Sequence, residues 1–111
     1  ELLTIQQNGG TRDLSLDEIL YLEGTPNRRV LFHVLNLSQP LEVSGRLSDY
    51  EISLAGKGFL RLQKSFIANM THICKISSYL VTLRDGTVIK ASEKYYRQVH
   101  DSFLMWKGLH L

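Results

Sequence analysis

Apolar and polar residues alternate along most of the chain, and a period of two predicts β-strands. The alternation is clearest in LLTIQQ (2–7), ILYLEG (19–24) and FLRLQ (59–63). Turn residues separate such segments, for example Asn8-Gly9-Gly10 after the first. Further segments of this kind are TRDLSL (11–16), RVLFHVL (29–35), QPLEVSG (39–45), HICKI (72–76), YLVTLR (79–84) and TVIKA (87–91). The pattern therefore predicts a mostly-β protein.

One turn among these strands has a specific prediction. Asp85 and Gly86 stand between the last two segments. A two-residue type I′ turn requires positive φ at both of its central positions, and Asp-Gly tolerates this. The dipeptide therefore predicts a type I′ β-hairpin.

A short helix is predicted ahead of residue 59. The residues SDYE (48–51) match a capping box, in which the serine oxygen accepts from a backbone amide and the glutamate reaches back. Leu47 and Ile52 flank the box as a hydrophobic staple, and Gly56 is a helix stop. Together they predict a helix over about 49–55.

A second helix is predicted near the C-terminus. Ser92 is a good N-cap, Glu93 complements the positive helix end, and Gly108 ends the segment. The apolar residues in between fall at spacings of three, four and three, which places them on one face; they are Tyr96, Val99, Phe103 and Trp106. We expect the first three to pack against the sheets.

The totals predict one domain of 111 residues. No apolar run reaches the roughly 20 residues of a membrane span, and no signal peptide is visible. A single cysteine, Cys74, excludes an internal disulfide and fits a reducing, cytoplasmic compartment. Because the sequence opens at Glu1, we expect residues 1–111 to be a piece of a longer protein.

Charge is distributed unevenly along the chain. Residues 1–53 hold four Lys or Arg against eight Asp or Glu, whereas residues 54–111 hold nine against three. A balance of +6 in the second part suggests a surface that faces a polyanion. Chance segregation of surface charge is the alternative.

Candidate catalytic and metal-binding patterns are weak. His33, His72, His100 and His110 are scattered, and His72 with Cys74 supplies two ligands where a zinc site needs more. We expect that pair to be half-buried strand residues and Cys74 to be an inert core thiol. Gly56-Lys57-Gly58 lacks the frame of a phosphate-binding loop. The sequence therefore predicts no enzyme and no cofactor.

The segment FLRLQKSFIANMTHICKI (59–76) carries the main functional signal. Polar side chains gather at a bend between apolar positions, and we expect Asn69 to fix the following turn by bonds to the backbone. The segment resembles the "F-x-R-x-H-R-S-y-i-V-N" motif of the LytTR family of bacterial DNA-binding domains. DEILYLEG (17–24), the capped helix and VTLRDGTVIKASEKYYRQV (81–99) resemble other family segments in the same order.

The resemblance implies an elongated arrangement of small antiparallel β-sheets with a short central helix and a C-terminal helix. It also implies that loops, rather than a recognition helix, enter the major groove of double-stranded DNA. The domain, residues 1–111, would then be the C-terminal output part of a two-component transcriptional regulator, with an upstream receiver or sensor domain. Paired promoter repeats bound by two copies, or a homodimer, would follow.

Three loops should supply the contacts: the one after ILYLEG, the bend after FLRLQ, and the start of the second helix. Lys, Arg, Gln and Ser side chains donate to phosphates, and Arg, Lys or Gln also read base edges. The predicted contact residues are Asn27, Arg28, Arg29, Lys57, Arg61, Gln63, Lys64, Ser65, Ser92, Lys94 and Arg97. Arginines in a loop are also often merely solvated, and Ser92 is an N-cap whether or not it touches DNA.

Two positions depart from the family pattern. Gln63 stands in place of the usual His, and Glu93 stands where Arg often follows the serine. A carboxylate facing phosphate is unfavourable, so either Glu93 points away or the third loop contributes less. The alternative function is a protein-interaction or dimerisation module, which the apolar tail would favour; that tail comprises Phe103, Leu104, Met105, Trp106, Leu109 and Leu111.

Overall fold

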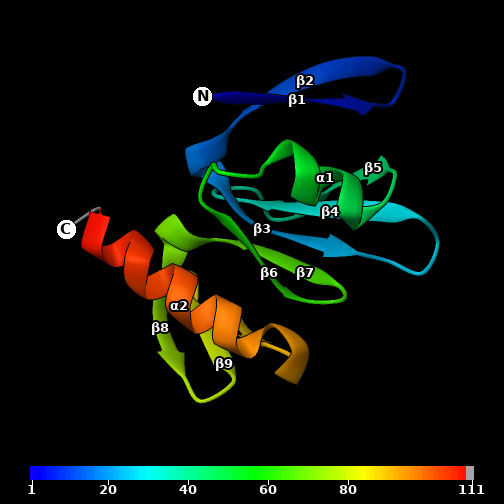
Figure 1. Cartoon of the computed structure of the whole chain (residues 1–111). Helices are drawn as coiled ribbons and strands as arrows, with labels where there is room; N and C mark the ends of the chain where they lie inside the picture. The colour runs from blue at the N-terminus through cyan, green and yellow to red at the C-terminus, as the bar shows by residue number, and fades with distance from the viewer. Residues whose placement is uncertain (110–111) are drawn as a thin grey trace.

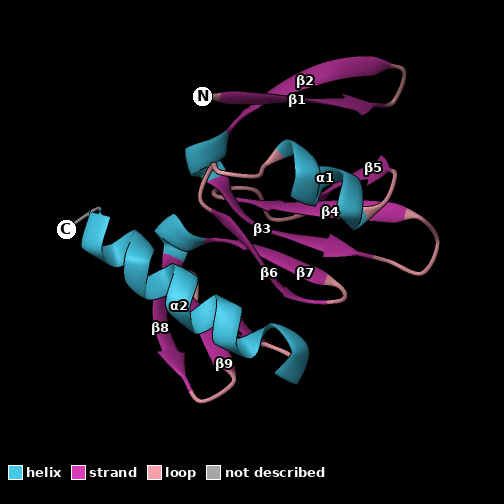
Figure 2. Ribbon diagram, viewed as in Figure 1, coloured by secondary structure: helices cyan, strands magenta, loops and turns pink. Residues whose placement is uncertain are grey.

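A computed structural model describes residues 1–109 (Figure 1). Ten strands, two α-helices and two short 3-10 helices alternate along the chain. In order they are β1 (Leu2–Gln7), β2 (Gly10–Ser15), η1 (Leu16–Glu18), β3 (Ile19–Gly24), β4 (Arg29–Val34), β5 (Leu41–Ser44), α1 (Leu47–Ser53), β6 (Phe59–Gln63), β7 (Phe66–Asn69), η2 (Met70–His72), β8 (Ile73–Ser77), β9 (Leu80–Leu83), β10 (Val88–Lys90) and α2 (Glu93–Leu109). The predicted mostly-β fold is confirmed (Figure 2).

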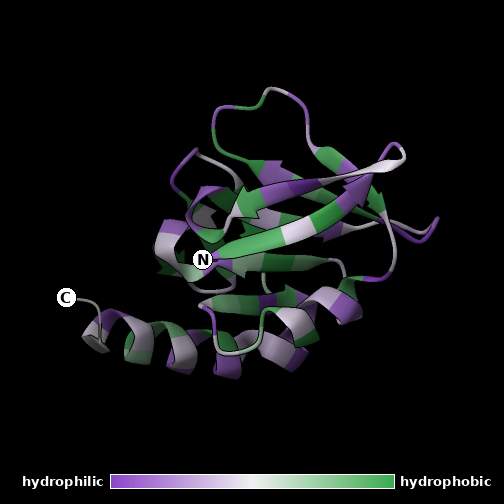
Figure 3. Cartoon of the chain, turned by 90° about the horizontal axis from the view of Figure 1, so that it is seen from above, coloured by the Kyte–Doolittle hydropathy of each residue, from purple (hydrophilic) through white to green (hydrophobic). Residues whose placement is uncertain are grey.

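The strands form three antiparallel sheets. β1 and β2 make a ribbon, β5-β4-β3-β7-β6 make a five-stranded sheet, and β10-β9-β8 make a three-stranded sheet. They are stacked along a molecule of 41 × 30 × 25 Å, with α1 beside the five-stranded sheet and α2 along the three-stranded one (Figures 1 and 3). This agrees with the predicted elongated arrangement of small sheets.

Two hydrophobic cores hold the sheets together. The first lies between the ribbon, α1 and one face of the five-stranded sheet, with Leu22 and Phe32 at its centre. The second lies between the opposite face, the three-stranded sheet and α2, and contains Leu62 and Val99. Alternation in β4 directs its large apolar side chains into the first core, and alternation in β6 directs those of β6 into the second.

Strand β7 does not follow the alternating pattern and was not predicted. Its residues Ile67, Ala68 and Asn69 are all buried. Ile67 belongs to the first core and Ala68 to the second, because β7 lies inside the sheet between β3 and β6. A strand that is buried on both faces loses the polar positions on which a period-two prediction depends.

Helix α1 is present, but its predicted cap is wrong. The N-cap residue is Arg46, whose side chain makes no capping bond, and Ser48 lies inside the helix. The Asp49 amide donates to the Arg46 carbonyl at 3.1 Å, so the first turn closes before Ser48. Ile52 is 77% exposed, which rules out its staple with buried Leu47.

The hairpin between β9 and β10 is present, but the predicted type I′ turn is wrong. Asp85 does not have positive φ, and the Leu83 amide pairs with the Thr87 carbonyl across a three-residue loop. Gly86 supplies the positive φ, at 94°. Positive φ at two successive positions occurs instead between β1 and β2, where Asn8 has 51° and Gly9 has 78°.

Helix α2 buries the predicted stripe, with Val99 buried and Tyr96, Phe103 and Trp106 half-buried against the second core. The helix continues through Gly108 to Leu109, so the predicted stop at Gly108 is wrong. In the predicted apolar tail, Leu104 and Met105 are exposed, while Leu111 and the side chain of Leu109 lie outside the described residues. No helix in residues 1–109 is long and apolar enough to span a membrane.

Gly58 immediately precedes β6 and lies against the Trp106 ring near the end of α2. We expect Gly58→Ala to destabilise the fold by about 2–4 kcal/mol. Its φ is +88°, and a Cβ there would lie 2.7 Å from the Trp106 ring. Both the backbone and the indole would therefore have to move. Urea unfolding measures the free-energy change.

Gly56→Ala is the matched control. Gly56 also has positive φ, +75°, but a Cβ there meets no atom within 4 Å. For this variant we expect only the cost of placing alanine at positive φ, about 1–2 kcal/mol of the free energy of unfolding. Equal losses for the two variants would show that Trp106 does not restrict Gly58.

Candidate nucleic-acid interface

The β6–β7 turn, Lys64-Ser65, lies between the two other predicted loops. On one side, the Gly24 amide at the end of β3 donates to the Ser65 carbonyl at 2.8 Å. On the other, the Ser92 amide donates to the Leu62 carbonyl at 3.0 Å. These bonds connect all three loops at one edge of the molecule, away from the N-terminus and from the end of α2 (Figure 1).

Two grooves run along this edge and share Arg61 and Lys64. One, of about 750 Å³, separates the turn from the start of α2. The other, of about 380 Å³, separates the turn from the β3–β4 loop. Of the charged side chains lining them, only Glu93 is acidic; the basic ones are Arg28, Arg29, Arg46, Arg61, Lys64, Lys90 and Lys94. Such an edge suits a polyanion.

The β3–β4 loop presents Asn27, Arg28 and Arg29, all exposed. Arg28 has a φ of 57°, an uncommon value for a residue with a side chain. Arg29 lies at the start of β4, where Nη1 donates to Ser44 Oγ at 3.2 Å and Nε lies 3.6 Å from Glu42. Arg28 is therefore the less engaged of the two arginines.

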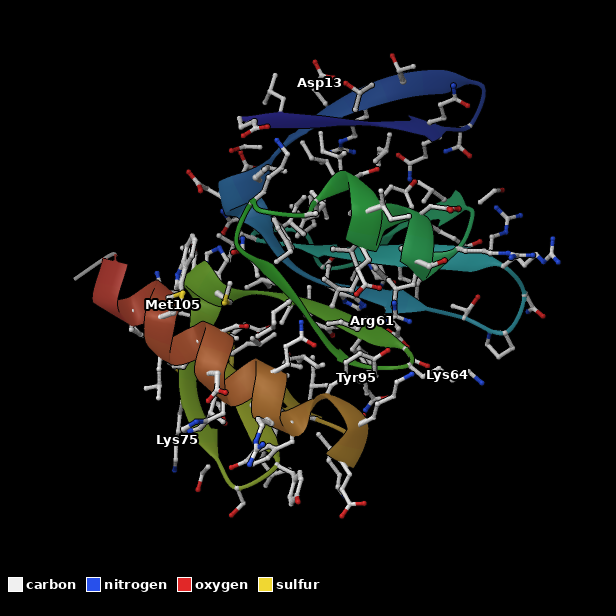
Figure 4. The ribbon with its side chains drawn as sticks, viewed as in Figure 1. Asp13, Arg61, Lys64, Lys75, Tyr95 and Met105 are labelled. Atoms are coloured by element: carbon white, nitrogen blue, oxygen red, sulfur yellow. The ribbon has the colours of Figure 1, made fainter. Side chains whose placement is uncertain are left out.

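Lys64 extends from the tip of the turn, near Tyr95, while Arg61 lies behind the turn (Figure 4). The Arg61 side chain is only 14% exposed and is bonded within the protein. Gln63 Nε2 donates to the Lys90 carbonyl at 2.8 Å. Of the predicted residues in this segment, Lys64 is thus the one most open to solvent.

The start of α2 presents Lys94 and, one turn later, Arg97, both exposed. The Lys94 ammonium lies 5.3 Å from the centre of the Tyr95 ring, a cation–π distance. Ser92 precedes the helix, but its Oγ is buried without a hydrogen-bond partner among the described residues. The predicted side-chain capping by Ser92 is therefore absent. Glu93 is exposed in the first turn.

Lys57 is a predicted contact that the structure places in a different groove, whereas Asn27 and Arg97 adjoin the two basic grooves in sequence without lining them. Lys57 pairs with Glu1 and lines its groove together with Trp106. The hydrogen bond from Lys57, together with its positive charge, lowers the pKa of the Glu1 carboxyl. Lys57 precedes β6, and the strand carries the chain about 13 Å from Phe59 to Gln63.

Sequence reasoning missed four groove residues: Arg46, Tyr79, Lys90 and Tyr95. Arg46 lies in the half of the chain whose net charge is negative, so the charge count concealed it. Lys90 is two residues before the predicted Ser92, and that proximity was the available signal. Tyr79 and Tyr95 add aromatic surface to the larger groove.

His72 and Cys74 are not a pair of half-buried strand residues, which corrects the prediction: His72 is buried in η2, and Cys74 is exposed on β8. His72 is 4% exposed, and its Nε2 lies 2.6 Å from the Asp17 carbonyl. Cys74 is exposed, so the predicted core thiol is wrong. A register shift between β8 and β9, between Ile73 and Lys75, breaks the alternation. No group of three His, Cys, Asp or Glu within residues 1–109 could hold a metal ion.

Comparisons with protein families and with solved structures find similar domains. The family model described as the LytTr DNA-binding domain matches residues 9–103. The fold is similar to a solved LytTr DNA-binding domain from Bacillus cereus, of a protein named as a methyl-accepting/DNA response regulator. The two share 21% identity over 93% of this chain and 95% of that one, with a TM-score of 0.74. A comparison with curated protein sequences finds no match.

Proposed function

We infer that this chain, which belongs to the LytTR family of DNA-binding domains, recognises a particular sequence of double-stranded DNA. Membership confirms the resemblance noted in the sequence. The proposed role is that of the output domain of a bacterial transcriptional regulator. The observation that carries the proposal is the edge with two basic grooves on either side of Lys64.

Phosphates would hold the domain in place along this edge. Lys90 and Arg46 lie in different grooves, and Arg97 follows on α2. Contacts of this kind add affinity without sequence information. Lys57 is left out of the contact set because it lies by Trp106 and Glu1.

Base edges would be read by one side chain from each loop. We assign this role to Arg28, with Asn27 beside it, to Lys64, and to Lys94. Arg28 can grip guanine O6 and N7 with two hydrogen bonds, which contributes about 1–3 kcal/mol of discrimination. Lysine offers a flexible point charge, so its discrimination is weaker. Arg29 would support Arg28, since Ser44 and Glu42 engage its guanidinium.

Selection of bound duplexes from a random pool tests these roles. Arg28→Ala is expected to relax preference at one base position, at a cost of about 1–3 kcal/mol for the preferred site. Arg97→Ala should weaken binding to all sequences alike and reduce the log–log salt slope by about one. Lys64→Ala should do some of both, because its neighbours Gln63 and Ser65 suit phosphate.

An unchanged motif with Arg28→Ala, Lys64→Ala and Lys94→Ala would contradict base reading by the loops. The loops would then only position the domain, and specificity would come from DNA shape. Arg12→Ala is the matched control, because Arg12 is exposed on β2 in the ribbon, outside both grooves. It should leave both motif and affinity unchanged.

Analogy with the family also suggests which domain precedes this one in the chain and how copies are arranged on DNA. We propose a cytoplasmic regulator whose receiver or sensor domain lies upstream, with two copies bound to paired promoter repeats. The N-terminus lies away from the edge with the basic grooves (Figure 1), so an upstream domain joined there would leave the grooves open.

A protein-interaction module is the second candidate function. Leu104 is 58% exposed and Met105 is 70% exposed on α2. Contiguous exposed apolar patches mark contact surfaces, and these two adjacent side chains would form part of one. The two candidate functions can be distinguished by the basic edge: DNA binding requires it, and a protein-interaction module does not.

A further inference from the structure

We propose that Arg61 is a positioning residue rather than a DNA contact, and that Glu51 on α1 positions Arg61 in turn. Together they would hold the β6–β7 turn in the shape from which Lys64 reaches DNA. The inference rests on the proposed DNA-binding function and deepens it.

Three hydrogen bonds place the Arg61 guanidinium behind the turn. Nε donates to the Gln63 carbonyl at 2.8 Å, and Nη2 donates to the Lys64 carbonyl at 2.6 Å. Nη1 donates to Glu51 Oε1 at 2.6 Å. Every nitrogen of the guanidinium therefore donates a hydrogen bond within the protein. A bidentate grip on a phosphate needs two nitrogens whose bonds are not already made in this way.

The two carbonyls belong to consecutive residues, and this explains what the bonds do. Gln63 ends β6 and Lys64 begins the turn, so the two bonds fix the backbone where the chain leaves the strand. The register of β6 against β7 shifts between Arg61 and Gln63, as in a β-bulge. A bulge disrupts the ladder of hydrogen bonds, and Arg61 supplies donors where it does so.

Glu51 completes the arrangement from another element. Its predicted role was to cap α1, but its carboxylate lies against Arg61 instead. It neutralises a cation that would otherwise add to the field at the two grooves. It also connects α1 to the turn, so that a rigid helix supports the loop.

The substitutions Arg61→Gln and Arg61→Lys test the proposal. Arg61→Gln should weaken binding to a selected duplex by about tenfold, as loss of hydrogen bonds to a charged group does. Its log–log salt slope should equal that of the wild type, because no phosphate contact is lost. Lysine keeps the charge but not the three-way geometry, so Arg61→Lys should also lose affinity. Amide hydrogen exchange at residues 63–66 of the free protein should rise in both variants.

Glu51→Gln separates the two roles of Arg61 further. A phosphate-contacting Arg61 would be released by this change, and binding would tighten. A positioning Arg61 loses its support, so exchange at residues 63–66 should rise and affinity should not increase beyond that of Asp49→Asn. Asp49 is an exposed carboxylate on the same helix that does not bond Arg61, which makes it the matched control.

Two results would overturn the inference. One is a log–log salt slope for Arg61→Gln that is shallower than that of the wild type by about one. The other is unchanged exchange at residues 63–66 in Arg61→Gln and Arg61→Lys, with thermal unfolding confirming that both are folded. Failure of the wild-type domain to bind any duplex would instead overturn the proposed function, and the exchange experiment on free protein would still report whether Arg61 fastens the turn.

Discussion

Raising the salt concentration from 50 to 200 mM is expected to weaken binding of the domain to duplex DNA by about 250- to 16,000-fold. The grooves carry seven basic side chains, and Arg61 is engaged internally, which leaves six for DNA. Each neutralised phosphate releases close to one counterion, so the log–log slope should lie at about −4 to −7. Fluorescence anisotropy at four salt concentrations measures it.

Matched lysine variants locate the effect. Lys64→Gln should reduce the slope by about one. Lys75→Gln should leave it unchanged, because Lys75 is exposed on β8, well away from Lys64 (Figure 4). Absence of binding at 50 mM salt would contradict the proposed function and favour the interaction module.

Asn69→Ala is expected to reduce the free energy of unfolding by about 3–5 kcal/mol, since it removes three hydrogen bonds to backbone groups at a buried site. Asn69 is 3% exposed, and Nδ2 donates to the Leu16 and Ile19 carbonyls at 3.0 and 2.9 Å. Its Oδ1 accepts from the Thr71 amide at 3.1 Å. The sequence-based prediction that Asn69 fixes the turn by backbone bonds is confirmed.

Chemical denaturation of Asn69→Ala and Asn36→Ala makes the comparison. Asn36 is exposed and has a φ of 66°, so only its backbone preference is lost, at a cost below about 1 kcal/mol. Similar losses for the two variants would mean that the carbonyls of Leu16 and Ile19 find other donors. Asn69 would then be no more important than a surface asparagine.

Local patterns predicted most strands because alternation is decided by near neighbours. β1, β3 and β6 occupy the predicted residues, and a loop follows β3 as predicted. β7 was missed for the opposite reason, since its burial on both faces is imposed by β3, β6 and two cores. The position of a strand within a sheet is not a property of that strand's own sequence.

Caps and turns were less predictable because several local solutions compete within a kcal/mol or so. Leu47 packs beside Gly24 in the first core, and α1 begins there instead of after Ser48. Glu51 was thereby released from capping and bonds Arg61. The Asp85-Gly86 turn adopts a three-residue loop in which Asp85 accepts from the Thr87 amide at 3.0 Å.

The sequence by itself determined the strand pattern, the stripe of α2 and the order of motifs that identifies the family. These are carried by residue type and spacing, which act over a few positions. The tertiary structure alone decided which cations share an edge: Arg46 and Lys90 join it, Lys57 does not, and Arg61 turns inward. The physical reason is the length of charged side chains. A lysine or arginine takes its partner from whatever the fold brings within several ångströms, and Glu51 or Glu1 lies 10 or 56 residues away in the chain.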